Sequence, residues 1–250
     1  MDQFPGWAEK FYDLYFGPYL PNTEAAQARV EQGLPRLLKH LPKKGSRVLD
    51  LCCGAGVYLF DVEKAGFAMT GVDIQAKMIG AAQRRAAKIG SRARIAVGDA
   101  MDLKFGDASF DAVLFLGAAT GHFSVQHLRR VMSEAYRVLK PGGVLVAEIN
   151  DHVALFLSGM YQRILYEPSG EKDVFSLHTN YDGEKGTFNR LFVDLDKNRR
   201  FKGSFQIWAP WIFNHIMDEV GFEFKASEAG AFGNFSRFLI HRKLSKRTRK

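Results

Sequence analysis

The chain has 250 residues, 46% hydrophobic and 25% charged, which suits one large domain with a packed core and room for an insert. Its net charge is +8, but six positive charges fall within residues 242–250, so the rest of the chain is near neutral at +2. No apolar run approaches the about 20 residues of a membrane helix, and the first residues lack the basic and apolar parts of a signal peptide, so we expect a cytoplasmic protein without a membrane partner.

The first 44 residues are predicted to form a helical cap. Aromatic residues are frequent over residues 7–19, and Thr23 is a suitable N-cap for a helix over residues 24–40. Pro42 and Gly45 then end the helical pattern.

Strands and helices alternate over residues 45–151, the predicted core. Because such alternation implies parallel strands with right-handed crossovers, we expect an α/β fold of three layers, Rossmann-like, with ligands at the carboxyl ends of the strands. The predicted strands are 47–51, 68–72, 94–97, 110–116 and 144–149, and the predicted helices are 57–65, 76–89 and 125–139.

The pattern changes after residue 151. Residues 175–181, 187–195 and 200–208 are predicted strands separated by turn signals, which makes residues 152–209 an antiparallel meander inserted late in the chain. A helix over 210–220 and strands over 222–226 and 236–242 complete the core within residues 210–243, and the basic tail is 244–250.

Three carboxylates follow three successive predicted strands. Asp50 ends the first strand beside a turn containing Gly54 and Gly56, and glycine lets the backbone approach a ligand closely. Asp73 ends the second strand, where a carboxylate can accept both ribose hydroxyls of a nucleoside. Asp99 follows the third strand and is placed to accept from an adenine amino group. One such carboxylate could be a helix cap, but three together indicate a nucleoside site.

The residues around the same turn favour a cationic nucleoside over a dinucleotide as the ligand. A dinucleotide loop requires a third small residue where this chain has Leu59, and it holds a pyrophosphate at a helix N-terminus. Asp50 would repel a diphosphate but favour a ligand with an amino group and a sulfonium. Ile74 and Met101 can pack on the faces of the adenine.

Five segments together resemble the class I S-adenosylmethionine-dependent methyltransferases: VLDLCCGAG at 48–56, GVD at 71–73, GDA at 98–100, SFDAV at 109–113 and RVLKPGG at 137–143. The resemblance implies S-adenosylmethionine as cofactor, no metal, and a seven-stranded sheet whose last strand is antiparallel. It further implies that Gly54 and Gly56 approach the methionine moiety. Cys53 stands where many members have a small residue, so we expect a slightly different loop. The expected cofactor-binding residues are Tyr12, Asp50, Cys53, Gly54, Gly56, Asp73, Ile74, Met78, Asp99, Ala100, Met101 and Leu116.

Two cysteines, Cys52 and Cys53, are adjacent in this turn. Adjacent cysteines rarely form a disulfide, and two thiolates do not make a zinc site. We interpret them as small packed residues at a strand end.

The acceptor is encoded more weakly than the cofactor. His122 follows the fourth strand and can act as a base or orient a nucleophile, although a capping or packing histidine explains it equally well. The pair Gly121-His122 resembles a segment of the amino-sugar N-methyltransferases. The chain lacks an Asn-Pro-Pro-Tyr segment after this strand, which argues against adenine amines and glutamine amides as acceptors.

The N-terminal segment YDLY at 12–15 resembles one that covers the cofactor in small-molecule methyltransferases. That resemblance implies that Tyr12 or Tyr15 reaches the methionine carboxylate or the acceptor, whereas an amphipathic helix with buried aromatics explains Phe11 and Phe16. The catalytic candidates are therefore His122 and Tyr15.

The insert is rich in aromatic residues and is predicted to be a lid over the acceptor, or else a small satellite core or a homodimer contact. Arg163, His178 and Arg190 could select an anionic substrate. The sequence favours a methyltransferase acting on N or O of a small molecule. An RNA methyltransferase using the tail and the cluster Arg84, Arg85, Lys88, Arg92 and Arg94 is a weaker alternative, and a non-catalytic binding protein is a third.

Overall fold

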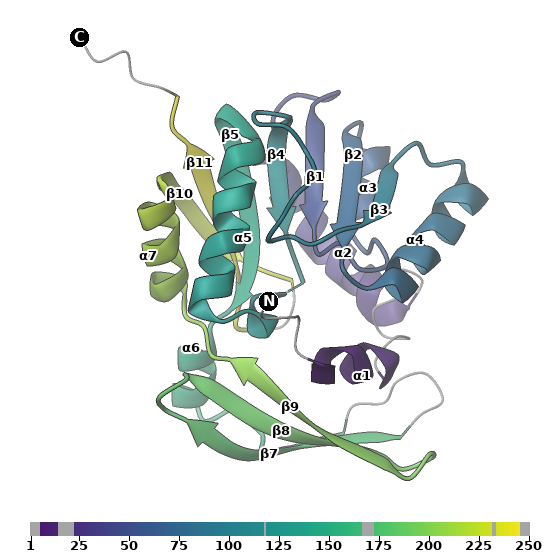
Figure 1. The fold of residues 1–250 in the computed structure, drawn as a ribbon, viewed down its shortest axis with the longest axis vertical. Helices are drawn as coiled ribbons and strands as arrows, with labels where there is room; N and C mark the ends of the chain where they lie inside the picture. Colours follow the sequence, from purple (N-terminus) through teal and green to yellow (C-terminus); the bar gives the residue numbers. More distant parts are fainter. Residues whose placement is uncertain (1–5, 15–22, 118, 167–172, 232–233, 246–250) are drawn as a thin grey trace.

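The computed structural model describes residues 6–14, 23–117, 119–166, 173–231 and 234–245. Two β-sheets organise these residues (Figure 1): a large sheet with helices on both faces, and a smaller sheet beneath one end of it. Within the described part of the chain, no helix is long and apolar enough to cross a bilayer.

The large sheet has seven strands in the order β10-β11-β5-β4-β1-β2-β3. The pairs β1–β2, β1–β4, β2–β3 and β4–β5 are parallel, whereas β11 is antiparallel to both β5 and β10. This confirms the Rossmann-like methyltransferase fold with an antiparallel last strand. The strands are β1 (Arg47–Leu51), β2 (Ala68–Asp73), β3 (Arg94–Val97), β4 (Phe110–Phe115), β5 (Leu139–Asn150), β10 (Phe222–Ala229) and β11 (Ser236–Lys243).

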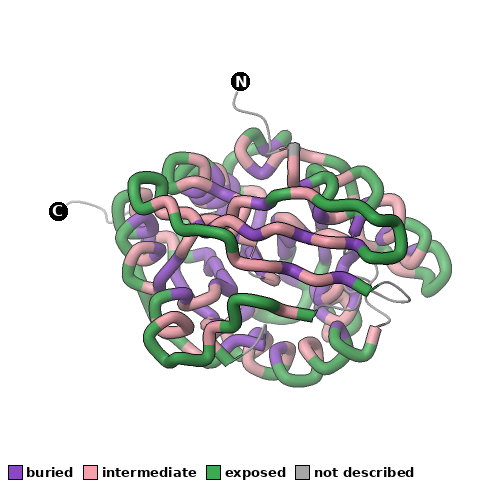
Figure 2. Tube along the Cα trace, turned by 90° about the horizontal axis from the view of Figure 1, so that it is seen from below, coloured by how far each residue is buried: buried purple, intermediate pink, exposed green. Residues whose placement is uncertain are grey.

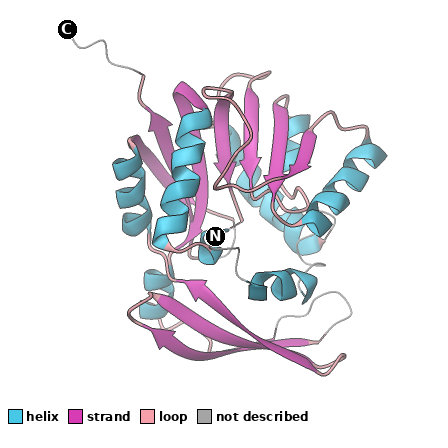
Figure 3. Ribbon diagram, viewed as in Figure 1, coloured by secondary structure: helices cyan, strands magenta, loops and turns pink. Residues whose placement is uncertain are grey.

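Helices cover both faces of this sheet (Figure 3). On one face α2 (Glu24–Leu38), α3 (Leu59–Lys64) and α4 (Ala76–Ile89) pack over a cluster that includes Val48, Leu114 and Val146. On the other face α5 (Val125–Val138) and α7 (Pro210–Val220) pack over a cluster that includes Leu49 and Val113. Neighbouring residues of β1 and β4 thus face opposite layers, as period-2 strands require.

Local sequence explains where the helices begin and end. The side chain of Thr23 accepts a hydrogen bond from the backbone N–H of Ala26, so the predicted N-cap of α2 is confirmed. Ser124 caps α5 in the same way. Gly90 and Gly221 end α4 and α7 in the left-handed conformation, which glycine adopts without strain.

The smaller sheet has the order β6-β7-β8-β9, all antiparallel, and lies beneath the carboxyl ends of the parallel strands. Its strands are β6 (Ile164–Tyr166), β7 (Val174–Asp182), β8 (Thr187–Asp194) and β9 (Arg199–Gln206). The three predicted strands of the meander are confirmed. The short β6 and the six-residue α6 (His152–Leu157) are additions, because segments of three to six residues carry too little periodicity to be recognised.

Alternate residues of β8 are buried, and the buried set faces the rest of the molecule; Figure 2 shows this sheet crossing the face seen from below. The helix α1 (Gly6–Leu14) lies between the two sheets. Phe11 and Leu14 of α1 form a small core with Val174 and Phe192 of the smaller sheet. The helix and the insert therefore form one cover over the carboxyl end of the large sheet.

Candidate cofactor and acceptor site

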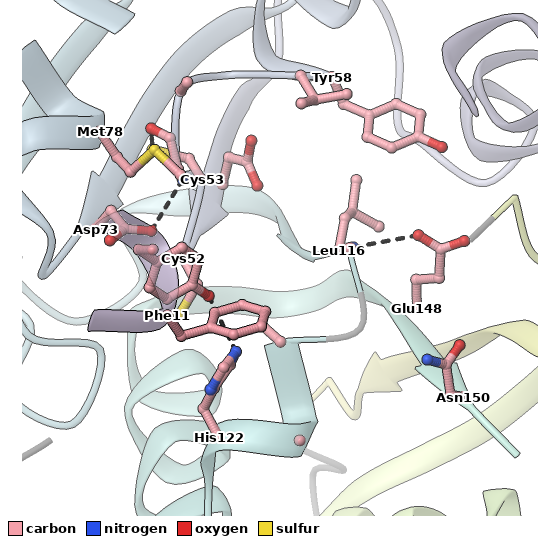
Figure 4. A pocket seen from close by; sticks show the side chains of 18 of the residues that line it. Phe11, Cys52, Cys53, Tyr58, Asp73, Met78, Leu116, His122, Glu148 and Asn150 are labelled. Carbon is pink, nitrogen blue, oxygen red and sulfur yellow. Dashed lines mark hydrogen bonds between the residues drawn. The ribbon is translucent and has the colours of Figure 1, made fainter. Parts of the chain in front are cut away.

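A cavity opens at the carboxyl ends of β1, β4 and β5 (Figure 4). We call it the main cavity. Its floor is formed by residues in and after these strands, and its cover by α1, the start of α6 and the smaller sheet. The floor includes Asp50, Cys52, Gly54, Leu116, Gly117, Glu148 and Asn150, and the cover includes Phe11, Tyr12, His152, Phe188 and Phe205.

A smaller cavity, here the side cavity, adjoins the main cavity on the β2–β3 side. It is lined by Ile74, Gly98, Asp99, Ala100, Met101 and Phe123, among others. The two cavities have five lining residues in common, Tyr12, Cys52, Asp73, Ala119 and His122, and we call these the shared wall. A ligand with two unlike ends can therefore occupy both cavities and cross this wall.

The turn after β1 brings backbone N–H groups against β2. The N–H of Cys53 donates to the carbonyl of Val72 at 3.1 Å, and the N–H of Gly54 donates to Oδ2 of Asp73 at 2.9 Å. Gly54 has φ +53°, and a side chain there would meet no atom within 4 Å of its Cβ, so the backbone borders open space. A Cβ at Gly54 would fill this open space, so glycine here allows a ligand to approach the backbone closely.

Cys52 has φ +57° in this turn, a conformation that favours glycine. Cys52 lies on the shared wall, Cys53 is buried, and neither forms a disulfide. Cys53, the residue at which we expected the loop to differ, also lines the main cavity, and the positive φ of Cys52 is an additional feature of this turn.

Asp73 is fixed by backbone on one side and faces ligand space on the other. Its Oδ1 accepts from the N–H of Gln75 at 2.8 Å, and its Oδ2 accepts from Gly54. Burial raises the pKa of Asp73, while these two hydrogen bonds oppose the shift. Each carboxylate oxygen has a second lone pair, so the group can still accept two hydroxyls of a ribose.

Asp50 is the most buried acid of the main cavity after Glu148, with 3% of its surface exposed. Burial, with a smaller contribution from the charge of Asp73, raises the pKa of Asp50 to about 8. No residue in the described ranges neutralises it with an ion pair. A cationic ligand would restore its charged form, which fits the ammonium and sulfonium of S-adenosylmethionine.

Asp99 lines the side cavity. Its Oδ1 accepts from the N–H of Met101 at 2.8 Å, which leaves the rest of the carboxylate for a ligand. Ile74 and Met101 line the same cavity, as expected for residues that pack on an adenine. Together with the acids at β1 and β2, this donor set fits a cationic nucleoside.

His122, in the short 3-10 helix η2 (Ala119–His122), lies under α1. Its Nε2 is 3.0 Å from the hydroxyl of Tyr12. The rings of Trp7, Phe11 and Phe205 lie 5.5 to 5.8 Å from the imidazole, centroid to centroid. Burial among these rings lowers the pKa of His122 to about 4, so the imidazole is neutral at pH 7.

One predicted residue lies away from the cavities. Gly56 lines neither of them, and its tight turn at φ +80° packs against the ring of Phe60 instead. Tyr15 falls outside the described residues, as does the end of the basic tail after residue 245. Met78 and Leu116 line the main cavity, and Ala100 lines the side cavity.

The charged residues singled out in the insert do not line either cavity. Arg190 is buried inside the smaller sheet, where it donates to the carbonyl and hydroxyl oxygens of Ser176. Arg163 and His178 likewise line neither cavity. Their selection of an anionic substrate has no support in the geometry.

Sequence reasoning missed Arg29, Glu148, Asn150 and His152, which all line the main cavity. Glu148 is structural: its Oε1 accepts from Ala231 N–H and the Ser236 hydroxyl, and its Oε2 accepts from Gly117 N–H. Glu148 and Asn150 end β5, so the rule that placed the other acids at strand ends could have found them. His152 and Arg29 depend on how the insert and α2 pack.

Comparison with known proteins agrees with this geometry. Residues 48–143 match the profile of the family described as "Methyltransferase domain". The PH0226 protein of Pyrococcus horikoshii OT3 has a similar structure, with a TM-score of 0.74 and 29% identity over 94% of this chain and 98% of that one. The S-adenosylmethionine-bound amino pentose methyltransferase CalS10 of Micromonospora echinaspora has the same fold, with a TM-score of 0.63 and 19% identity over 97% and 99%.

The fold and the strand-end acids agree with this match: residues 48–143 are similar to methyltransferase domains of the class that uses S-adenosylmethionine. Among curated proteins the chain is similar to 24-methylenesterol C-methyltransferase 2 of Oryza sativa subsp. japonica, at 34% identity over 57% of this chain and 38% of that protein. The aligned region spans less than half the length of such curated relatives.

Proposed function

We propose that the protein is an enzyme that transfers a methyl group from S-adenosylmethionine to a nitrogen or oxygen of a small molecule. The observation that carries this proposal is the shared wall, because it joins a side cavity lined by Asp99, Ile74 and Met101 to a main cavity with an aromatic cover. A methyl donor held at the wall would present its reactive carbon to an acceptor in the main cavity.

In this proposal each of the three aspartates contacts a different part of the cofactor. Asp99 accepts from the adenine amino group, Asp73 accepts from the ribose hydroxyls, and Asp50 faces the ammonium. Ile74 and Met101 pack on the adenine, and the turn at Gly54 borders the methionine moiety. When bound, S-adenosylmethionine supplies an electrophilic methyl group on a sulfonium.

The protein residues then position the acceptor and exclude water, which is most of what an in-line displacement requires. Phe11, Phe188 and Phe205 line the main cavity and suit an apolar or ring-shaped acceptor. His122 is neutral at pH 7, so its ring can accept a proton from the acceptor or orient its nucleophile through Tyr12.

A small acceptor is favoured over RNA by the shape of the site. α1 and the smaller sheet cover the main cavity, and a folded RNA could not enter without displacing them. The cluster Arg84, Arg85, Lys88, Arg92 and Arg94 lines neither cavity, and Arg85 lies over the ring of Phe60 on the surface of the α3–α4 layer.

Incubation with methyl-labelled S-adenosylmethionine, a metabolite extract and total RNA tests this function. We expect label in the low-molecular-mass fraction, and loss of that label with Asp73→Ala. Label confined to RNA, or binding of the cofactor without any transfer, would contradict the proposal.

A further inference from the structure

His152 is held at the cavity by two backbone contacts with Trp208. It begins α6 directly after β5, and its N–H donates to the carbonyl of Trp208 at 2.9 Å. The N–H of Trp208 in turn donates to Nδ1 of His152 at 3.0 Å. Trp208 itself is fully buried, and its indole N–H donates to the carbonyl of Thr120 at 2.8 Å. The imidazole therefore has a fixed place and a fixed orientation.

The contact at Nδ1 also fixes where the ring proton lies. A backbone N–H can only donate, so Nδ1 of His152 must present its lone pair, and the proton of the neutral ring must be on Nε2. Burial lowers the pKa of His152 to about 4, so this neutral form persists at pH 7. In the described part of the chain the hydrogen bonds of His152 involve its backbone N–H and its Nδ1, not Nε2, and the residue lines the main cavity.

The surroundings indicate what this donor would meet. The ring of Phe188 lies 5.5 Å and that of Phe156 lies 6.4 Å from the imidazole, centroid to centroid, so the donor is flanked by apolar surface. Asn150, two residues earlier, lies on the β5 side of the main cavity, away from Asp73 and Cys52 (Figure 4). The fixed N–H thus lies in a largely aromatic part of the cavity, where it is open to a hydrogen-bond acceptor on a ligand.

We propose that Nε2–H of His152 donates a hydrogen bond to an oxygen on a ring-shaped or otherwise apolar acceptor, and so selects acceptors that carry a carbonyl or hydroxyl oxygen at that end. The inference rests on the proposed function, because it takes the main cavity to be the acceptor site. It assigns to His152 a specificity role that differs from that of His122 on the shared wall.

The substitution His152→Asn distinguishes the contribution of Nδ1 from that of Nε2. An asparagine Oδ1 can take the place of Nδ1 and keep the bond from Trp208 N–H, while its side chain is too short to replace the Nε2–H donor. His152→Leu removes both and serves as the comparison for structural damage. We expect the melting temperature of His152→Asn to stay close to that of the wild type and that of His152→Leu to fall.

A pair of probes of equal shape tests the donor without knowledge of the natural acceptor. 2-Acetonaphthone carries a carbonyl oxygen where 2-isopropenylnaphthalene carries a CH₂ group. Binding of each is measured by NMR titration with S-adenosylhomocysteine present. We expect the wild type to prefer the ketone by about five- to tenfold, the worth of one hydrogen bond, and His152→Asn to bind both about equally.

The NMR signals of the two ring nitrogens of His152 provide a second test, which needs only the wild-type protein. The ketone should shift the Nε2 resonance, and the alkene should leave it in place. Equal affinity of the wild type for both probes, an unchanged preference in His152→Asn, or a proton on Nδ1 would overturn the inference. Failure to bind S-adenosylhomocysteine would instead count against the proposed function.

Discussion

The hydroxyl of Tyr12 in α1 lies 3.0 Å from Nε2 of His122 in η2. This contact ties the N-terminal helix to the segment that follows β4, across 110 residues of sequence. Both residues belong to the shared wall, so the position of the helix and the separation of the two cavities depend on each other.

Removing the Tyr12 hydroxyl should weaken the attachment of α1 to the segment after β4 without unfolding the protein. Tyr12→Phe keeps a ring that packs 5.3 Å from Phe11, but it loses the hydrogen bond to His122, worth about 0.5–1.5 kcal/mol. We expect catalytic efficiency to fall by about two- to tenfold while the melting temperature changes little. Steady-state kinetics measure the effect, and Tyr166→Phe, which loses a hydroxyl bonded to Asp173 at the surface, is the control. Equal losses in both variants would contradict the role of Tyr12.

Replacement of His122 should affect turnover more than cofactor binding. If the neutral ring accepts a proton, His122→Ala should lower kcat by about 10²- to 10⁴-fold and leave the affinity for S-adenosylhomocysteine nearly unchanged. Because the pKa of His122 is lowered to about 4, the wild-type kcat should show no loss from protonation of this ring between pH 5 and 8. His215→Ala, at an exposed histidine of α7, is the control. An unchanged kcat in His122→Ala would show that His122 contributes to packing and not to catalysis.

Loss of the Asp73 carboxylate should weaken cofactor binding by about 1–3 kcal/mol, because a charged hydrogen-bond acceptor is removed. Asp73→Ala also deprives the N–H groups of Gly54 and Gln75 of their acceptor, so Asp73→Asn, which can keep one of these bonds, helps to separate binding from loop damage. Calorimetric titration measures both, with Glu219→Gln on α7 as a remote control. Wild-type affinity in Asp73→Ala would mean that the ribose is held elsewhere.

Cofactor binding should release a proton from Asp50. In the free protein the pKa of Asp50 is raised to about 8, so the carboxyl is protonated at pH 7; a bound ammonium would stabilise the charged form and lower that pKa. Affinity for S-adenosylhomocysteine should therefore increase as the pH rises from 6 towards 8, and level off above 8, where Asp50 is already ionised. Calorimetry in two buffers of different ionisation enthalpy counts the protons.

Asp50→Asn supplies the control for this linkage. The variant has no proton to release from this position, so its binding enthalpy should lose most of its dependence on the buffer. Proton release of the same size in Asp50→Asn and the wild type would show that another group titrates.

The parts of the site that lie at strand ends could be predicted from the sequence, because parallel strands place their carboxyl ends at one edge. Asp50, Asp73 and Asp99 follow from that rule, and the structure brings all three to the two adjoining cavities. The contribution of His152 could not be predicted in this way. It depends on the bond from Trp208, which is 56 residues away, and thus on how the insert folds back.

The loop after β1 shows a second limit of sequence reasoning. The pattern predicts a turn, but it does not indicate that Cys52, a residue other than glycine, has a positive φ. Likewise, the two glycines of the turn have different tasks: Gly54 borders the cavity, and Gly56 packs against Phe60. Spacing alone does not distinguish them.

A crystal structure with S-adenosylhomocysteine bound would show directly how a ligand occupies the two cavities. We expect the adenine in the side cavity against Asp99, the ribose hydroxyls on Asp73, and the sulfur at the shared wall, facing the main cavity. An adenine in the main cavity, or a ribose without contact to Asp73, would contradict this expectation.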